Sequence, residues 1–177
     1  MEKQSLCLEK AKNVRCIVFD VDGVLTDGRI LMDGEGNELK SFNVRDGLRI
    51  VMARKQGMKV AFLTGRESDA VSRRAAELSV DHVFQGVRDK SQALGSLLET
   101  TGLSRGGIAY LGDDIPDLPA MRAVGLAGAV GDASPEVLEA SDWKARASGG
   151  CGAAGEFIEF ILQSQGLWDE ALREEGE

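Results

Sequence analysis

Residues 16–28 read CIVFDVDGVLTDG, and this stretch constrains the fold more than any other part of the chain. Its apolar run from Cys16 to Phe19 predicts a short buried strand, and Asp20 and Asp22 follow where that strand ends. Residues at i and i+2 of a strand share a face, so the two carboxylates can converge on one point. Two converging carboxylates are costly unless a cation or a shared proton relieves them. The stretch therefore predicts a metal site at the edge of a sheet.

The rest of the chain alternates between short apolar runs and longer amphipathic segments. We expect further strands at 59–63, 82–84, 107–111 and 124–127 and near Trp143, and helices at 46–56, after Ser68, from Lys90, at 118–123, after Pro135 and from about Gly152. This alternation predicts an α/β fold with a doubly wound parallel sheet and helices on both faces. Residues 28–32 and 38–42 flank DGEGN, which is typical of a hairpin turn. The hairpin carries apolar residues and has no neighbouring segment to bury them.

Length and composition favour a soluble globular protein of one domain. The 177 residues predict a single domain over 1–177, with its core at about 14–164 and an acidic, solvated tail at 165–177. A net charge of −8 argues against binding to nucleic acid or anionic membranes. No apolar run approaches the roughly 20 residues of a membrane span, and residues 1–12 lack the core of a signal peptide. The three cysteines show no metal-binding or disulfide spacing. We therefore expect a cytoplasmic protein with reduced thiols.

Polar residues follow the apolar strands at several points. Asp20, Asp22, Thr64, Asp113 and Asp114 each come after a predicted strand, and the carboxyl ends of parallel strands share one rim. Lys90, at a predicted helix start, should point at the same rim. Such carboxylates suit Mg²⁺, and a threonine, the Gly65 amide and a lysine suit a phosphoryl group. One carboxylate could act as nucleophile and a second as acid and base, so the sequence predicts phosphate monoester hydrolysis.

Four segments, in order along the chain, resemble the motifs of haloacid dehalogenase-type phosphatases. They are Asp20-x-Asp22-Gly23, Leu63-Thr64-Gly65-Arg66, Lys90, and Gly112-Asp113-Asp114-x-x-Asp117. The resemblance covers about residues 14–164. It implies that Asp20 is the nucleophile, that Asp22 is the general acid and base, and that Thr64 and Lys90 hold the phosphoryl group. It also implies that Mg²⁺ binds Asp20, the backbone carbonyl of Asp22, and Asp113, with Asp114 and Asp117 as auxiliary acids.

The spacing of the motifs leaves no room for the cap domain that many members of this superfamily carry. Residues 21–63 are filled by the predicted hairpin and helix, and residues 65–89 are too few. This pattern resembles the 3-deoxy-D-manno-octulosonate 8-phosphate phosphatases, which are capless tetramers. The resemblance implies that the hairpin packs on another subunit of a homotetramer. It further implies contacts with a phosphorylated sugar acid, in addition to Asp22, from a set of residues in three segments: Asn43, Val44, Arg45, Asp46, Gly47, Arg66, Arg74 and Lys90.

Two positions depart from that family pattern. Gly155 stands where an arginine is expected, and so does Val51, one turn into the helix after Gly47. A nine-carbon sugar acid 9-phosphate is therefore an alternative substrate. A non-catalytic, phosphatase-like oligomerisation module is another alternative, although no motif residue is missing.

Other features have plainer interpretations. A phospho-signalling receiver would place its phosphorylated aspartate on a later strand than its acid pair, which is not the pattern here.

The single histidine, His82, lies in an apolar strand and is expected to be structural. The glycine-rich segment 148–152 could receive an anion or be a flexible connection.

Overall fold

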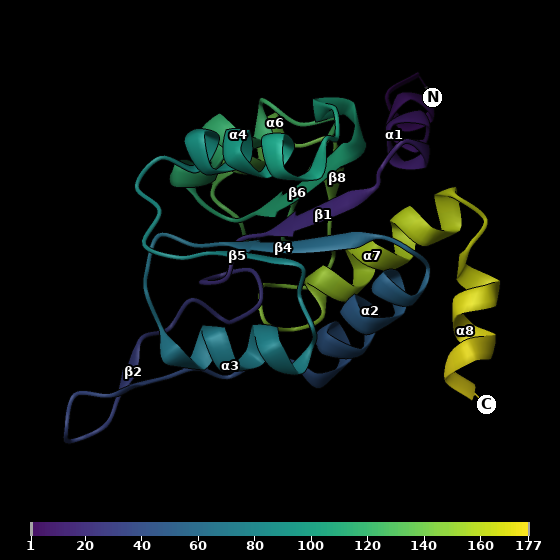
Figure 1. Ribbon diagram of the computed structural model, residues 1–177. Helices are drawn as coiled ribbons and strands as arrows, with labels where there is room; N and C mark the ends of the chain where they lie inside the picture. Colours follow the sequence, from purple (N-terminus) through teal and green to yellow (C-terminus); the bar gives the residue numbers. More distant parts are fainter. Residues whose placement is uncertain (1, 177) are drawn as a thin grey trace.

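The computed structural model describes residues 2–176, so Met1 and Glu177, the ends of the predicted domain and tail, lie outside the described residues. Within this range six parallel strands form one sheet in the order β5-β4-β1-β6-β7-β8. The strands are β1 (Cys16–Phe19), β4 (Lys59–Leu63), β5 (His82–Phe84), β6 (Ile108–Gly112), β7 (Leu126–Ala129) and β8 (Trp143–Lys144). The predicted doubly wound parallel sheet is confirmed (Figure 1).

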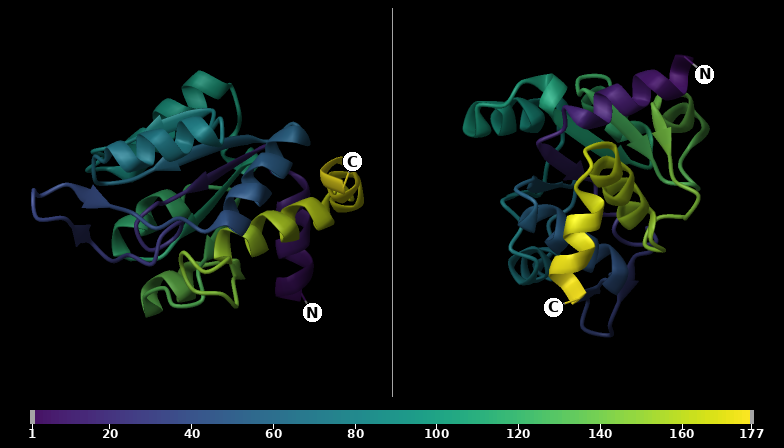
Figure 2. Two further views of the ribbon diagram at one scale, coloured as in Figure 1. Left: turned by 90° about the horizontal axis from the view of Figure 1, so that it is seen from below. Right: turned by 90° about the vertical axis from the view of Figure 1, so that its right-hand side faces the viewer.

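Helices cover both faces of this sheet. One face carries α2 (Val44–Lys55), α3 (Asp69–Glu77) and α7 (Ala153–Ser164), and the other carries α4 (Lys90–Thr101), α5 (Leu118–Met121) and α6 (Pro135–Ala140) (Figures 1 and 2). The N-terminal helix α1 (Glu2–Lys12) packs along α7. Strands β1, β6 and β7 are buried along their whole length because helices cover them from both sides. No described helix has the length and apolar character to cross a bilayer.

The strand order reverses between β1 and β6. From β1 the chain proceeds to β4 and β5 on one side, and from β6 it proceeds to β7 and β8 on the other. In the register of the sheet, Phe19 lies beside Phe62 and Leu111, so the residues after β1, β4 and β6 leave the sheet at one edge. Ligands of open α/β sheets bind at such a reversal.

The predicted hairpin is also present. Strands β2 (Leu31–Met32) and β3 (Glu38–Leu39) pair antiparallel and project from the body of the molecule (Figure 1). The side chains of Ile30, Leu31, Met32 and Leu39 are each half or more exposed. The hairpin, α2, α3 and β5 occupy the segments between β1 and α4, so the predicted absence of a cap domain is confirmed.

The structure corrects the bounds of two predicted elements. Helix α2 begins at Val44 instead of Asp46, because the Asn43 side chain accepts hydrogen bonds from the amides of Arg45 and Asp46. Strand β7 covers 126–129 instead of 124–127, since Gly125 lies against the backbone of Gly106 in the preceding loop.

The predicted acidic tail is largely exposed in its described part, but it forms a helix that the sequence did not indicate. Residues Trp168–Gly176 form helix α8, which packs against α2 and α7. Ala171 is buried, and the Arg49 guanidinium lies over the Trp168 ring at 5.2 Å. Glu174 and Glu175 accept hydrogen bonds from Gln56 and Lys55. The acidic residues thus occupy one face of an amphipathic helix whose other face is packed.

Candidate functional site

A cleft lies at the carboxyl ends of the central strands. It encloses about 330 Å³, and its lining residues are Asp20, Asp22, Gly28, Thr64, Gly65, Arg66, Val87, Arg88, Lys90, Asp113, Asp114, Pro116 and Asp117. Asp20 and Asp113 follow the adjacent strands β1 and β6, and the Asp20 amide donates to the Leu111 carbonyl at 3.1 Å. The structure therefore brings together every residue that was predicted to act in catalysis.

Lys90 occupies the centre of a buried polar network. Its Nζ donates to Asp20 Oδ1 at 2.7 Å and to Asp117 Oδ1 at 2.5 Å. Lys90 is the first residue of α4, where a cation opposes the helix dipole, and the Asp89 carboxylate caps the helix by accepting from the amides of Ser91 and Gln92. Although burial lowers the pKa of Lys90, Asp20 and Asp117 raise it overall, so the side chain stays charged.

Asp117 is an orienting residue rather than an open ligand. Besides Lys90, its carboxylate accepts the Tyr110 hydroxyl at 2.7 Å and the amides of Asp113 and Asp114 at 2.9 and 3.3 Å. Both of its oxygens are thus engaged by donors. Asp117 fixes the start of the short 3₁₀ turn Ile115–Asp117 and the side chain of Lys90 together.

The donor set of this cleft fits a divalent cation. Carboxylate oxygens of Asp20, Asp113 and Asp117 lie within 4.8 Å of one another. Burial raises the pKa of Asp20 to about 6 even though Lys90 lowers it. Burial, together with the Asp20 and Asp117 carboxylates, raises the pKa of Asp113 to about 8. Because Asp117 is already saturated by donors, Asp20 and Asp113 are the carboxylates left to hold Mg²⁺.

Thr64 is anchored at the end of β4. Its amide donates to the Phe84 carbonyl at 2.9 Å and its carbonyl accepts from the Val87 amide at 3.1 Å. The buried hydroxyl donates to Asp22 Oδ2 at 3.5 Å and accepts from the Arg66 amide at 3.4 Å. The Thr64 hydroxyl is therefore held against the cleft by the loops after β4 and β5.

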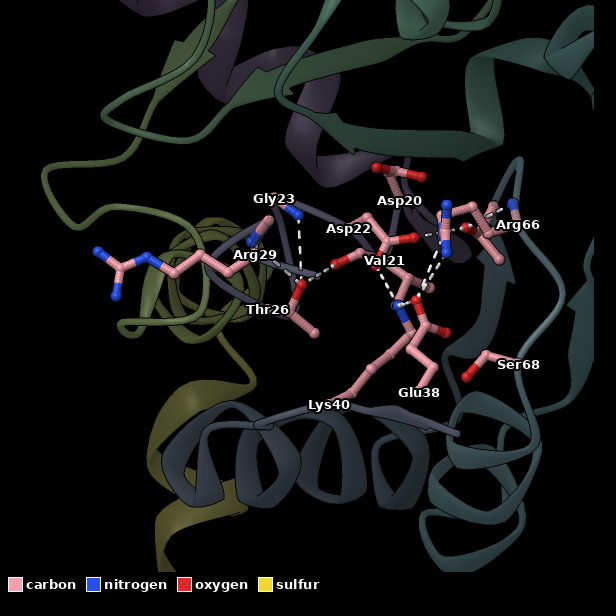
Figure 3. Close-up of polar contacts among 12 residues, drawn as sticks. Asp20, Val21, Asp22, Gly23, Thr26, Arg29, Glu38, Lys40, Arg66 and Ser68 are labelled. Atoms are coloured by element: carbon pink, nitrogen blue, oxygen red, sulfur yellow. Dashed lines mark hydrogen bonds and ion pairs between the residues drawn. The ribbon is translucent and has the colours of Figure 1, made fainter. Parts of the chain in front are cut away.

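Asp22 meets the base of the hairpin. The Lys40 ammonium, just after β3, donates to Asp22 Oδ1 and lies 3.3 Å from Glu38 Oε1 (Figure 3). Arg66 Nη2 donates to the same Glu38 oxygen at 3.0 Å. Burial raises the pKa of Glu38, but the Ser68 hydroxyl, Lys40 and Arg66 lower it overall. Ser68 precedes α3 as predicted, yet its hydroxyl does not cap that helix and lies beside Glu38 instead.

Sequence reasoning did not identify Glu38, Lys40 or Arg88 as residues of this region. The first two were assigned only to the hairpin, and nothing in their spacing signals a contact with Asp22. Arg88, which lines the cleft mouth, lies two residues before Lys90, and its position in the predicted loop was the one available signal.

Several predicted substrate contacts lie elsewhere. Asn43, Asp46, Gly47 and Arg74 line a separate small hollow beneath Phe42. The buried Asp46 accepts the Gly155 amide at 2.7 Å, so it caps α7 from the neighbouring helix. Val44 and Arg45 are exposed on the first turn of α2. Of the predicted set, the cleft contains Asp22, Arg66 and Lys90.

The two residues that depart from the family pattern, Val51 and Gly155, lie in helices α2 and α7. Val51 is partly buried against the core, and Gly155 is buried in the first turn of α7. A side chain at Gly155 would meet Asp46 Oδ1 and the Arg49 stem. His82 is half-buried in β5, outside the cleft, as expected for a structural residue.

The glycine-rich segment 148–152 packs against the loop that carries Asp22. The Gly149 amide donates to Asp132 Oδ1 at 2.9 Å, and the Gly150 amide donates to the Val24 carbonyl at 2.9 Å. A Cβ at Gly149 would overlap the carbonyl of Gly23. The segment therefore makes a close backbone contact with this loop. The sequence had suggested an anion site or a flexible connection instead.

Comparison with known proteins agrees with this site. Residues 83–148 match the family model of haloacid dehalogenase-like hydrolases. The chain is 44% identical, over 93% of its length and 87% of the relative's, to 3-deoxy-D-manno-octulosonate 8-phosphate phosphatase of Escherichia coli K12.

Solved structures give the same result. The phosphatase of that name from Yersinia pestis is 40% identical, with a TM-score of 0.91 over 93% of this chain and 89% of its own. The one from Moraxella catarrhalis, solved in complex with magnesium, phosphate and KDO, is 39% identical, with a TM-score of 0.92 over 94% of this chain and 96% of its own.

Proposed function

The chain belongs to the 3-deoxy-D-manno-octulosonate 8-phosphate phosphatase family of haloacid dehalogenase-like hydrolases, and on that premise we propose that it hydrolyses this sugar-acid phosphate with Mg²⁺ as cofactor. The observation that carries the proposal is the cleft in which Asp20 and Asp113, Thr64 and Lys90 meet. A relative of similar fold binds magnesium, phosphate and KDO.

The proposed metal ligands are Asp20, the backbone carbonyl of Asp22, and Asp113. When bound there, Mg²⁺ supplies positive charge that offsets the buried carboxylates and the phosphate oxygens. Asp117 keeps Lys90 in place, and Lys90 adds a second positive charge on the other side of Asp20.

The chain's own residues account for the chemistry. The Thr64 hydroxyl, the Gly65 amide and Lys90 hold the phosphoryl oxygens, and an Asp20 oxygen attacks phosphorus. The bond from phosphorus to the sugar oxygen breaks, and Asp22 donates a proton to that oxygen. Water then attacks the Asp20 phosphoryl group while Asp22 accepts its proton, and the bond to Asp20 breaks to give phosphate and the free carboxylate. Such acid–base assistance contributes about 10² to 10⁴ in rate.

The test is phosphate release from a panel of sugar and sugar-acid phosphates, with Mg²⁺ and with EDTA. We expect Mg²⁺-dependent release that prefers the eight-carbon acid, and its loss in Asp20→Asn. Asp169→Asn, at the exposed start of α8, is the matched control and should retain full activity. Release unchanged by EDTA or by Asp20→Asn would refute the proposal.

A nine-carbon sugar acid 9-phosphate is the second candidate substrate. It is favoured by Val51 and Gly155, which replace two expected arginines near α2 and α7. A preference of the wild type for that ester in the same panel would support this candidate over the first.

We also propose that the chain acts as a cytoplasmic homotetramer. Support for the assembly comes from the exposed apolar side chains of the hairpin. A substrate contact from the exposed Val44 or Arg45 would then reach the cleft of another subunit. A monomer by light scattering at micromolar concentration would refute the assembly.

A further inference from the structure

We propose that Lys40 is a positioning residue for Asp22, and that it holds the Asp22 carboxylate for the second half of the reaction. The proposal rests on the phosphatase function above. Lys40 is not part of any of the four motifs. It comes from the base of the hairpin, just after β3, where it lies beside Asp22 of the loop after β1 (Figure 3).

The burial of Lys40 shows that its contacts are specific. Its side chain is 2% exposed, against 23% for Asp22 and 14% for Glu38. Desolvating an ammonium costs several kcal/mol, so a buried lysine needs charged acceptors. Its ion-pair partners are the two carboxylates. A solvated hairpin lysine would have neither this burial nor two acidic partners.

The pairs form a chain of alternating charges across three segments. Asp22 belongs to the loop after β1, Lys40 and Glu38 to the hairpin, and Arg66 to the loop after β4. Without Lys40, the one remaining hydrogen bond from a side chain to the Asp22 carboxylate within residues 2–176 is the 3.5 Å contact with Thr64. That contact is at the limit of hydrogen-bond length. Lys40 is therefore the main restraint on the direction of this carboxylate.

The reaction step that needs this restraint is the hydrolysis of phosphorylated Asp20. Water attacks phosphorus, one water proton passes to the Asp22 carboxylate, and the bond between phosphorus and the Asp20 oxygen breaks with its electron pair returning to Asp20. Asp22 thereby regains the proton that it gave to the sugar oxygen. A misdirected carboxylate would slow this step for every ester, whereas it would slow phosphorylation of Asp20 only for an ester whose leaving oxygen needs the proton of Asp22.

The experiment compares wild type and Lys40→Met on two esters, the sugar-acid phosphate and p-nitrophenyl phosphate, with Mg²⁺. We expect kcat of the variant to fall about tenfold or more on both esters, since a general base supplies about 10² to 10⁴ in rate. The value of kcat/KM on p-nitrophenyl phosphate should change little, because it reports the steps up to phosphorylation and p-nitrophenolate leaves without a proton from Asp22. On the sugar-acid ester kcat/KM should fall as well, because the leaving sugar oxygen takes that proton. Rapid mixing should then show a burst of p-nitrophenol approaching about one per active site, followed by the slow phase.

Three further variants separate positioning from stability. Lys40→Arg keeps a cation in reach of both carboxylates and should restore much of kcat and reduce the burst. Glu38→Gln leaves the Asp22 pair intact and should give a smaller burst than Lys40→Met. Lys59→Met, exposed at the opposite edge of the sheet, is the matched control and should behave as wild type. Thermal unfolding of each variant shows whether it is folded.

The outcomes distinguish the proposals. A folded Lys40→Met enzyme with wild-type kcat and no burst would overturn the role of Lys40 and leave the phosphatase function in place. Loss of kcat/KM on the sugar-acid ester with kcat unchanged on both esters would also overturn it, because Lys40 would then bind substrate. A wild type that releases phosphate from neither ester would overturn the proposed function, and this inference with it.

Discussion

At the scale of residues, Asp113 and Asp117 stand four positions apart and have different surroundings. Asp117 accepts hydrogen bonds from Lys90, Tyr110 and two amides. Carboxylate oxygens of Asp113 and Asp20 lie within 4.8 Å of each other, and burial, followed by the charges of Asp20 and Asp117, raises the pKa of Asp113 to about 8. A divalent cation would relieve the repulsion between Asp20 and Asp113.

Asp113→Asn should therefore abolish stabilisation by Mg²⁺. At about 100 times its Kd a ligand adds about 2.7 kcal/mol to the free energy of unfolding, which corresponds to a rise in Tm of about 5 °C or more in a protein of this size. We expect this rise for the wild type and for Asp114→Asn, whose exposed carboxylate caps the following turn. An equal rise in Asp113→Asn, by differential scanning calorimetry, would exclude Asp113 as a ligand.

The sequence predicted the central residues of this site because each follows an apolar strand. Asp20, Thr64 and Asp113 are placed by the sheet itself, and a parallel sheet has one possible rim for them. Lys40 and Glu38 could not be predicted in the same way, because their contacts with Asp22 and Arg66 depend on the direction in which the hairpin leaves the sheet. Asp46 was assigned to substrate, but its partner is an amide of α7, a helix far along the chain.

At the scale of elements, the segment 148–152 fixes the loop that carries Asp22. Its backbone hydrogen bonds join it to Val24 and to Asp132, and the Asn43 side chain donates to the Gly150 carbonyl at 3.3 Å. Gly149 lies so close to the Gly23 carbonyl that no side chain fits between them. Composition identified this segment as unusual, but a contact between backbones leaves no further signal in the sequence.

Gly149→Ala should accordingly displace the loop after β1. We expect the free energy of unfolding to fall by about 1–3 kcal/mol, as for other overpacking changes, and kcat to fall with the displaced Asp22. Gly95→Ala is the matched control, because a Cβ there meets no atom within 4 Å in the middle of α4. That variant should gain up to about 1 kcal/mol. Urea unfolding and phosphate release measure both, and equal stability of the two variants would contradict the close contact.

Periodicity predicted the existence of most elements and failed at α8. The acidic residues from Asp169 onward suggested a solvated tail, whereas Trp168 and Ala171 pack the other face of the helix on the molecule. The number of charged residues does not reveal this packed face, because an amphipathic helix of nine residues needs few apolar side chains to pack.

At the scale of the whole molecule, carboxylates join the layers and make stability depend on pH. Asp81, before β5, accepts the Val60 amide at 2.9 Å and Arg54 Nε at 3.1 Å, and so ties α2 to the sheet. Burial raises the pKa of Asp81, but the hydrogen bonds from Val60 and Arg54 lower it overall. In the linkage relation, a carboxyl whose folded pKa lies below its unfolded value stabilises the fold above the unfolded pKa of about 4. That contribution disappears as the pH falls through the folded pKa.

Asp81→Asn should thus lower the free energy of unfolding at neutral pH and have a smaller effect on it at acidic pH. The amide oxygen can still accept from Val60, so the loss is that of the charged pair with Arg54, about 1 kcal/mol. Urea unfolding of both proteins at pH 7 should show this difference, and it should shrink toward zero as the pH falls through the folded pKa of Asp81, where the carboxyl of the wild type becomes protonated even when folded. A difference that stayed constant with pH would mean that the Asp81 carboxylate contributes through shape alone and that its charge does not join α2 to the sheet.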